Sequence, residues 1–122
     1  MISETVRGEG TWLLDDDGER FMVGKHEMAE LAPRDVVSRA IVKRISSQGG
    51  GRVWLDTRKI DGFRDRFPRI ARTLERFDLD PAKDLIPVHP AAHYMIGGVR
   101  TDLEGRTGVP GLLAIGEAAC SG

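Results

Sequence analysis

The sequence predicts an α+β fold, because a hairpin signal, two helical stretches and a series of extended segments follow one another along 122 residues. Apolar residues recur with helical spacing in two segments, and the spacing changes toward extended chain from Ile86 onward. No internal repeat or low-complexity linker interrupts this order. A chain of this length is expected to bury one small core.

The first half is predicted to contain a hairpin, a helix and a strand. Two short strands, around 10–14 and 20–23, are expected on either side of the Asp-Gly turn at 15–18. A helix from about 34 to 48 follows, because Pro33 suits a helix start and the glycines at 49–51 suit its end. The run RVWLD, residues 52–56, then predicts a short strand.

The second half is predicted to begin with an amphipathic helix and to continue as extended chain. The apolar side of the helix recurs in steps of four, three, four and three, at Phe63, Phe67, Ile70, Leu74 and Phe77. Pro68 either kinks this helix or marks its true start. The runs IPVHPAAHY, GGVRTD and GLLAIGEA are read as extended, with LEGRTGVP as a turn.

The last of these runs is apolar, and such a run normally lies inside a sheet with neighbours. Exposed apolar surface and self-association through an unpaired strand edge are therefore expected. The abrupt end of the sequence after this run predicts that the chain is part of a longer protein.

Composition excludes several classes of protein. Eighteen basic and nineteen acidic residues leave a net charge of −1, and no run of apolar residues is long enough for a membrane span or a signal peptide. We therefore expect a soluble, cytoplasmic protein with no nucleic-acid or membrane partner. Cys120 is the single cysteine, which excludes an intramolecular disulfide and a cysteine-based zinc cluster and favours a small buried filler.

No metal site is predicted from the three histidines. His89 and His93 are four residues apart, but Pro90 between them argues against a helix that presents both to one metal ion. His26 lies far away in the sequence and has no comparable neighbour.

Arg34 is the first candidate for chemistry. An arginine at a helix N-terminus faces the positive end of the helix dipole, an arrangement that costs about 0.3–1 kcal/mol when exposed. One compensation is an ion pair with Asp35 or Glu30. The other is that the helix end and the guanidinium together face an anionic ligand such as a carboxylate.

Two further candidates lie near glycines. His93 precedes Gly97 and Gly98, so it is either a core imidazole or a side chain on the rim of a site that the backbone can approach closely. Glu117 follows an apolar run and a glycine, where a carboxylate either holds ligand hydroxyl groups or caps a helix at the surface. No G-x-G-x-x-G dinucleotide fingerprint is present.

Four ordered motifs resemble one family. They are SETVRGEGTWL, AELAPRDVVSRAI, VHPAAHYMIGGVRTDLEGRT and VPGLLAIGEAACSG, and together they are similar to successive blocks of L-aspartate oxidases, relatives of the flavoprotein subunits of succinate dehydrogenase and fumarate reductase. The resemblance runs from about residue 3 to 122. It implies that residues 1–85 form the α+β capping domain that covers the substrate, and that 86–122 form the truncated segment returning into the FAD-binding domain.

The resemblance also implies roles for single residues. Arg34 matches the proton-transferring arginine of the superfamily, and His93 matches a histidine that binds a substrate carboxylate. Glu117 matches an acid that holds the ribityl chain of FAD. Ser3 and Glu4 match a threonine-glutamate pair near the substrate, with serine in place of threonine.

The activity implied for the full-length protein is FAD-dependent oxidation of L-aspartate to iminoaspartate, a step of quinolinate and NAD biosynthesis. The partners implied are a small dicarboxylate (L-aspartate, or fumarate or succinate) and the remainder of the FAD domain. Residues 1–122 alone are expected neither to bind FAD nor to oxidise L-aspartate. The alternatives are a piece of a succinate dehydrogenase or fumarate reductase flavoprotein, and a non-catalytic carboxylate- or protein-binding module.

Overall fold

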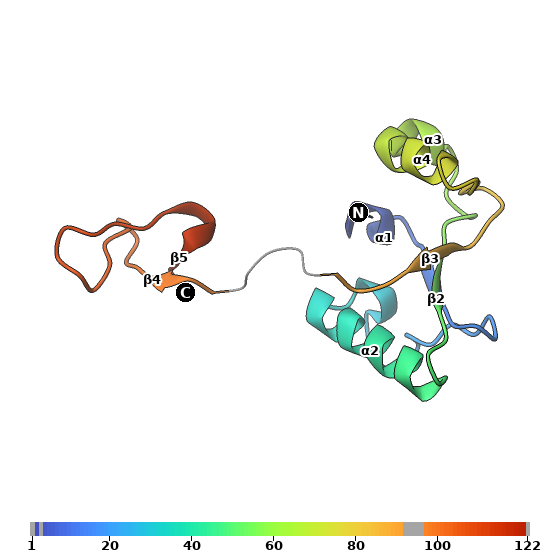
Figure 1. Cartoon of the computed structure of the whole chain (residues 1–122), viewed down its shortest axis with the longest axis horizontal. Coiled ribbons are helices and arrows are strands. Elements are labelled where there is room, and N and C mark those ends of the chain that lie inside the picture. The colour runs from blue at the N-terminus through green and yellow to red at the C-terminus, as the bar shows by residue number, and fades with distance from the viewer. Residues whose placement is uncertain (1, 3, 92–96, 122) are drawn as a thin grey trace. The chain divides into compact units, whose positions relative to one another are not determined.

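The computed structural model describes residue 2 and residues 4–91 and 97–121 of the chain. The chain divides into two compact units, Met1–Pro90 and Ala91–Gly122 (Figure 1). Helices and strands are mixed along the chain, which confirms the predicted α+β class. No helix within the described ranges is long and apolar enough to cross a membrane.

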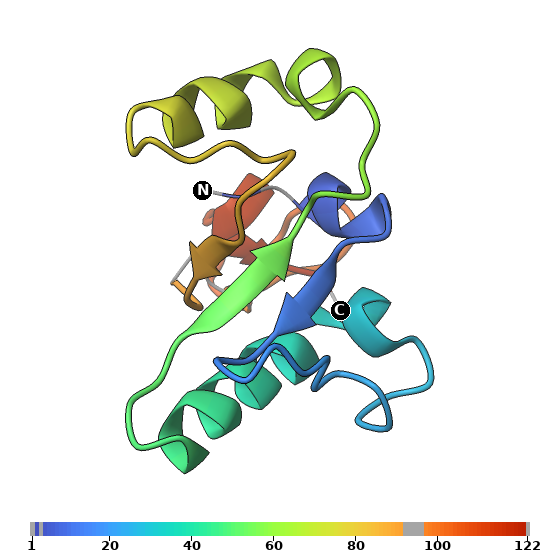
Figure 2. The same cartoon turned by 90° about the vertical axis from the view of Figure 1, so that its right-hand side faces the viewer.

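A three-stranded antiparallel sheet forms the centre of the first unit (Figure 2). It consists of β1 (Trp12–Leu14), β2 (Val53–Asp56) and β3 (Ile86–Val88), with β2 in the middle. Leu13 lies opposite Leu55, and Leu55 lies opposite Ile86. Because all three side chains are buried, this row across the strands is one side of the hydrophobic core.

Helix α2 (Arg34–Ser47) confirms the helix predicted between about 34 and 48. Its residues Val37 and Ile41, one turn apart, are buried in the same core as the sheet. Gly49 has a φ of +70°, and the Gly50 N–H donates to the carbonyl oxygen of Ile45. The glycines therefore end the helix in the way that the sequence predicts.

The amphipathic stretch divides into α3 (Phe63–Arg66) and α4 (Pro68–Glu75). Pro68 is the first residue of α4, so it marks a helix start rather than a kink within one helix. Phe63, Ala71 and Leu74 enter the core. The sheet lies between α2 and the α3–α4 pair in both views (Figures 1 and 2).

The second strand of the predicted hairpin, around 20–23, does not form. Only Arg20 pairs with Leu14, as an isolated bridge, and β1 takes β2 as its partner instead. The reason is the side chain of Asp15, which accepts hydrogen bonds from the backbone N–H groups of Asp17 and Glu19 and ends the pairing there.

The second unit contains β4 (Val99–Arg100) and β5 (Ala119–Cys120), which pair in parallel, and the 3₁₀ turn η2 (Gly116–Ala118). The strand predicted within GLLAIGEA does not form: Leu113 pairs with Arg106 only as an isolated bridge, and Gly116, with its positive φ, turns the chain after Ile115. Cys120 is half-buried with a free thiol.

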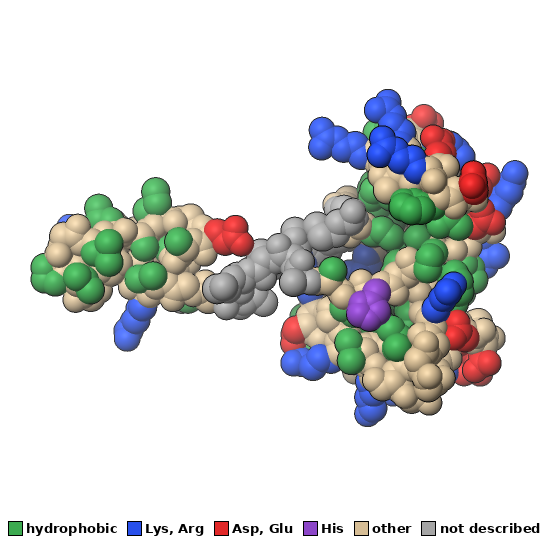
Figure 3. All heavy atoms as spheres, in the orientation of Figure 1, with side chains coloured by type: hydrophobic (Ala, Val, Ile, Leu, Met, Phe, Trp, Pro, Cys, Tyr) green, Lys and Arg blue, Asp and Glu red, His purple; other side chains and the backbone are tan. Residues whose placement is uncertain are grey.

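As predicted, the last segment exposes apolar side chains, and they spread over the surface of this unit (Figure 3). Ile115 is 81% exposed, and Leu103 in the preceding loop is 92% exposed. A two-stranded parallel pair with so little covered apolar surface is marginal in water on its own.

Candidate functional site

Arg34 is the first residue of α2, and only Ala32 and Pro33 separate it from the short 3₁₀ turn η1 (Ala29–Leu31). The helix α1 (Glu4–Gly8) contacts η1, so the segment that begins with Glu4 lies close to the turn that leads into Arg34. The fold therefore gathers two of the predicted motifs, SETVRGEG and AELAPRD, in one part of the first unit.

The two acids considered as partners of Arg34 are each engaged by another arginine. The carboxylate of Glu30 receives two hydrogen bonds from Arg20, at 2.8 Å and 2.5 Å. Asp35 pairs with Arg39, four residues along α2, at 2.5 Å. Asp35 and Glu30 therefore each have an arginine partner other than Arg34.

Glu30 is the most enclosed acid in this region, with only 3% of its surface exposed. Burial raises the pKa of its carboxyl, but the hydrogen bonds from Arg20 and from the Leu13 backbone N–H lower the pKa by more, so it lies below its ordinary value. Glu30 is thus held as a carboxylate inside the protein.

The other predicted site residues are placed less completely. Ser3 and His93 lie outside the described residues, and so does the side chain of Glu4, although its backbone begins α1. Glu117 lies in η2 of the second unit and is exposed. Arg34 belongs to the first unit and Glu117 to the second.

Glu117 follows Gly116, whose φ of +64° turns the chain out of the extended conformation of Ile115. Strand β4 passes very close to this turn, because a Cβ atom on Gly98 would lie 2.6 Å from the carbonyl oxygen of Ala118. Only glycine fits at position 98. The result is an exposed carboxylate beside a stretch of backbone and small side chains.

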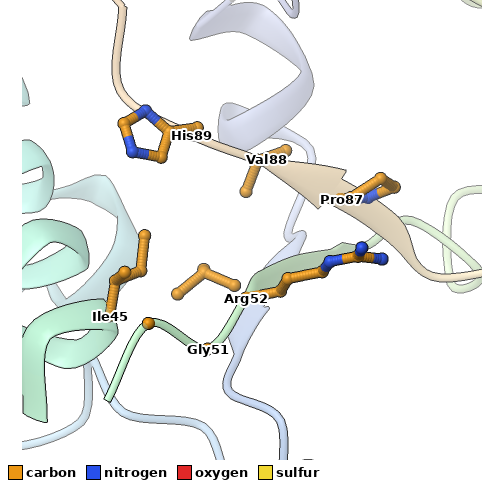
Figure 4. Close-up of a pocket in the computed structure, with 8 residues that line it drawn as sticks. Ile45, Gly51, Arg52, Pro87, Val88 and His89 are labelled. Atoms are coloured by element: carbon orange, nitrogen blue, oxygen red, sulfur yellow. The ribbon is translucent and has the colours of Figure 1, made fainter. Parts of the chain in front are cut away.

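A pocket of about 420 Å³ lies elsewhere, between the end of α2, the start of β2 and the end of β3. Figure 4 shows Ile45 and Val88 directed into it, with the imidazole of His89 at its edge and the guanidinium of Arg52 pointing away. Neither Arg34 nor Glu117 is among the described residues that line this pocket.

Two more buried acids stabilise the first unit in a way that depends on pH. Burial raises the pKa of Asp15, but hydrogen bonds from Arg44 and the Glu19 N–H lower it by more. The hydrogen bond from Arg58 lowers the pKa of Asp56. A carboxyl group with a lowered pKa in the folded state stabilises that state above its unfolded pKa, and this contribution disappears as pH falls through the folded pKa.

We therefore expect the free energy of unfolding to be constant from pH 7 to about 5 and to fall steadily below about pH 4. Urea denaturation followed by the fluorescence of Trp12 and Trp54, which lie in adjacent strands, measures it. Asp56→Asn should make the decrease shallower. A free energy of unfolding that is the same at pH 7 and pH 3 would contradict the assignment.

The family of the chain follows from its similarity to known proteins. The family model described as "FAD binding domain" matches residues 1–122. The chain is 52% identical to the L-aspartate oxidase of Streptomyces coelicolor and 46% identical to that of Bacillus subtilis, in each case over the whole chain. It spans only 21% and 23% of the length of these two relatives.

Two similar solved structures are both fumarate reductases. A quinol-fumarate reductase with menaquinol molecules superposes with a TM-score of 0.81 at 33% identity, covering 98% of this chain and 24% of that one. A mutant of E. coli quinol fumarate reductase gives a TM-score of 0.83 at 32% identity, covering 100% and 24%. Because the family model matches its full length, the chain belongs to the family of FAD binding domains.

Proposed function

We propose that the full-length protein is an FAD-dependent L-aspartate oxidase that converts L-aspartate to iminoaspartate. The observation that carries this proposal is the 52% identity to a curated L-aspartate oxidase across every part of the chain. The match covers the four motifs together with the segments between them. The product, an imine of a dicarboxylate, suits a route to quinolinate and NAD.

The second unit fits one part of FAD. Glu117 is an exposed acid next to backbone that is free of bulky side chains, and a carboxylate accepts hydrogen bonds from hydroxyl groups such as those of the ribityl chain. One glutamate does not make a cofactor site, so the remainder of the FAD domain must supply the other contacts. The exposed apolar side chains of this unit support such a contact surface.

In the proposed mechanism, Arg34 holds a substrate carboxylate so that the C2–H bond faces the cofactor. Because a guanidinium is not deprotonated in proteins, Arg34 acts first as an electrostatic clamp and only second as a proton relay. His93 would bind the same or the other carboxylate, with Ser3 and Glu4 nearby. Bound FAD supplies the hydride acceptor. Loss of the amine proton then leaves the imine.

We also assign residues 1–85 to the capping domain and 86–122 to the segment returning into the FAD domain. What supports this assignment is the division of the chain close to that boundary, between Pro90 and Ala91.

The deciding experiment is an anaerobic absorbance spectrum of the FAD-loaded full-length protein, mixed separately with L-aspartate and with succinate. Bleaching of the flavin band by L-aspartate alone is the expected result. Bleaching by succinate alone would move the protein to the second candidate, a dicarboxylate oxidoreductase, which the similarity to two fumarate reductases favours. Bleaching by neither would favour a non-catalytic carboxylate-binding module.

A further inference from the structure

A buried carboxylate attaches the turn before Arg34 to the sheet. Glu30, in the middle of η1, accepts two parallel hydrogen bonds from Arg20 and one from the backbone N–H of Leu13 in β1, at 3.3 Å. Planar, two-point contacts between a guanidinium and a carboxylate fix direction as well as distance. They therefore define both the position and the orientation of η1 on the sheet.

Arg20 is itself held in place. Its backbone pairs with Leu14 at the end of β1, and its guanidinium carbon lies 5.0 Å from the centre of the Trp12 ring. A cation at this distance over an indole is attracted to it. The pair of Glu30 and Arg20 thus joins η1 to all three residues of β1.

The link from Glu30 to Arg34 has little freedom. On the other side of Glu30, Ala29 has a φ of +46°, a conformation that a residue other than glycine keeps only when its surroundings impose it. Ala32 is completely buried, and the ring of Pro33 fixes its own φ. A shift of η1 is therefore passed on to the first turn of α2, where Arg34 begins.

We propose that Glu30 and Arg20 are positioning residues for Arg34: their buried pair sets the point from which the guanidinium of Arg34 reaches the substrate. This inference rests on the proposed function, in which Arg34 contacts a substrate carboxylate. Neither Glu30 nor Arg20 needs to touch substrate or cofactor, and both act by holding η1 against β1.

The test is a double-mutant cycle in the FAD-loaded full-length protein. Glu30→Gln keeps the shape of the side chain but loses the charge and one of the two acceptors that Arg20 uses. We expect it to slow anaerobic flavin reduction by L-aspartate about 10- to 100-fold, because small displacements of a clamp have large effects on rate. In the Arg34→Ala background the same change should have no further effect.

Asp56→Asn is the matched control. Asp56 is also a buried acid with its own arginine, Arg58, at 2.9 Å, but it lies at the end of β2 and its arginine partner is not Arg20. The Asp56→Asn change should lower the urea concentration at the midpoint of unfolding and leave the rate of flavin reduction unchanged. If Glu30→Gln does not fold, Arg20→Lys takes its place, since lysine keeps the charge but not the two parallel hydrogen bonds.

Each outcome separates this inference from the proposed function. An inactive Arg34→Ala protein together with a fully active, folded Glu30→Gln protein overturns the positioning role and leaves the proposed function intact. Equal slowing by Glu30→Gln with and without Arg34 also overturns it, because the effect would not pass through Arg34. Normal turnover by Arg34→Ala would instead overturn the proposed role of Arg34 itself.

Discussion

Replacing Arg34 with alanine in the FAD-loaded full-length protein should slow anaerobic flavin reduction by L-aspartate at least about 100-fold. The guanidinium is the one described side chain that both matches the expected catalytic arginine and begins a helix, where backbone N–H groups also point outward. Stopped-flow absorbance of the flavin band measures the rate. Arg34→Lys should not restore it, because an ammonium cannot reproduce the two-point contact with a carboxylate.

Arg39→Ala is the control for this prediction. Arg39 lies on the same helix and pairs with Asp35 on the surface, an interaction worth at most about 0.5 kcal/mol. Its loss should leave flavin reduction at the normal rate. If Arg39→Ala slowed the reaction as much as Arg34→Ala, the effect would come from the helix or the surface charge and not from a clamp at position 34.

The largest effect on stability is expected from Met22→Ala. Met22 has no exposed surface and is the largest of the fully buried side chains, so its truncation should leave a cavity and lower the free energy of unfolding by about 2–5 kcal/mol. Urea denaturation of the 122-residue chain, followed by tryptophan fluorescence, measures the loss.

Met28→Ala removes the same atoms at a position that is 52% exposed. It should change the free energy of unfolding by less than about 0.5 kcal/mol. A Met22→Ala protein as stable as Met28→Ala would show that the loop after β1 does not pack into the core in solution.

Local signals predicted the helices well. Pro33 and the glycines at 49–51 bound α2 to within a residue, and Pro68 starts α4, because these residues act through their own backbone geometry. The same local reasoning failed for the second hairpin strand. There the side chain of Asp15 competes for the backbone N–H groups, and β2, about forty residues away, takes the place of the expected partner.

The site was predictable only in part. The helix N-terminus identified Arg34 as unusual, but the sequence offered Glu30 as its partner, whereas Glu30 pairs with Arg20. That pairing depends on how an irregular segment of ten residues folds back on β1, for which no spacing rule exists. The roles of Ser3, Glu4, His93 and Glu117 stay predictions from the family resemblance.

The arrangement of the sheet has a consequence for folding during synthesis. The central strand β2 has its first partner, β1, long before Ile86–Val88 leaves the ribosome. Until then one edge of β2, with Val53 and Leu55, is uncovered and open to pairing with another chain. Because both pairings join residues far apart in sequence, the sheet is expected to close slowly. The nascent chain is therefore expected to be most vulnerable to aggregation before Ile86–Val88 has been made.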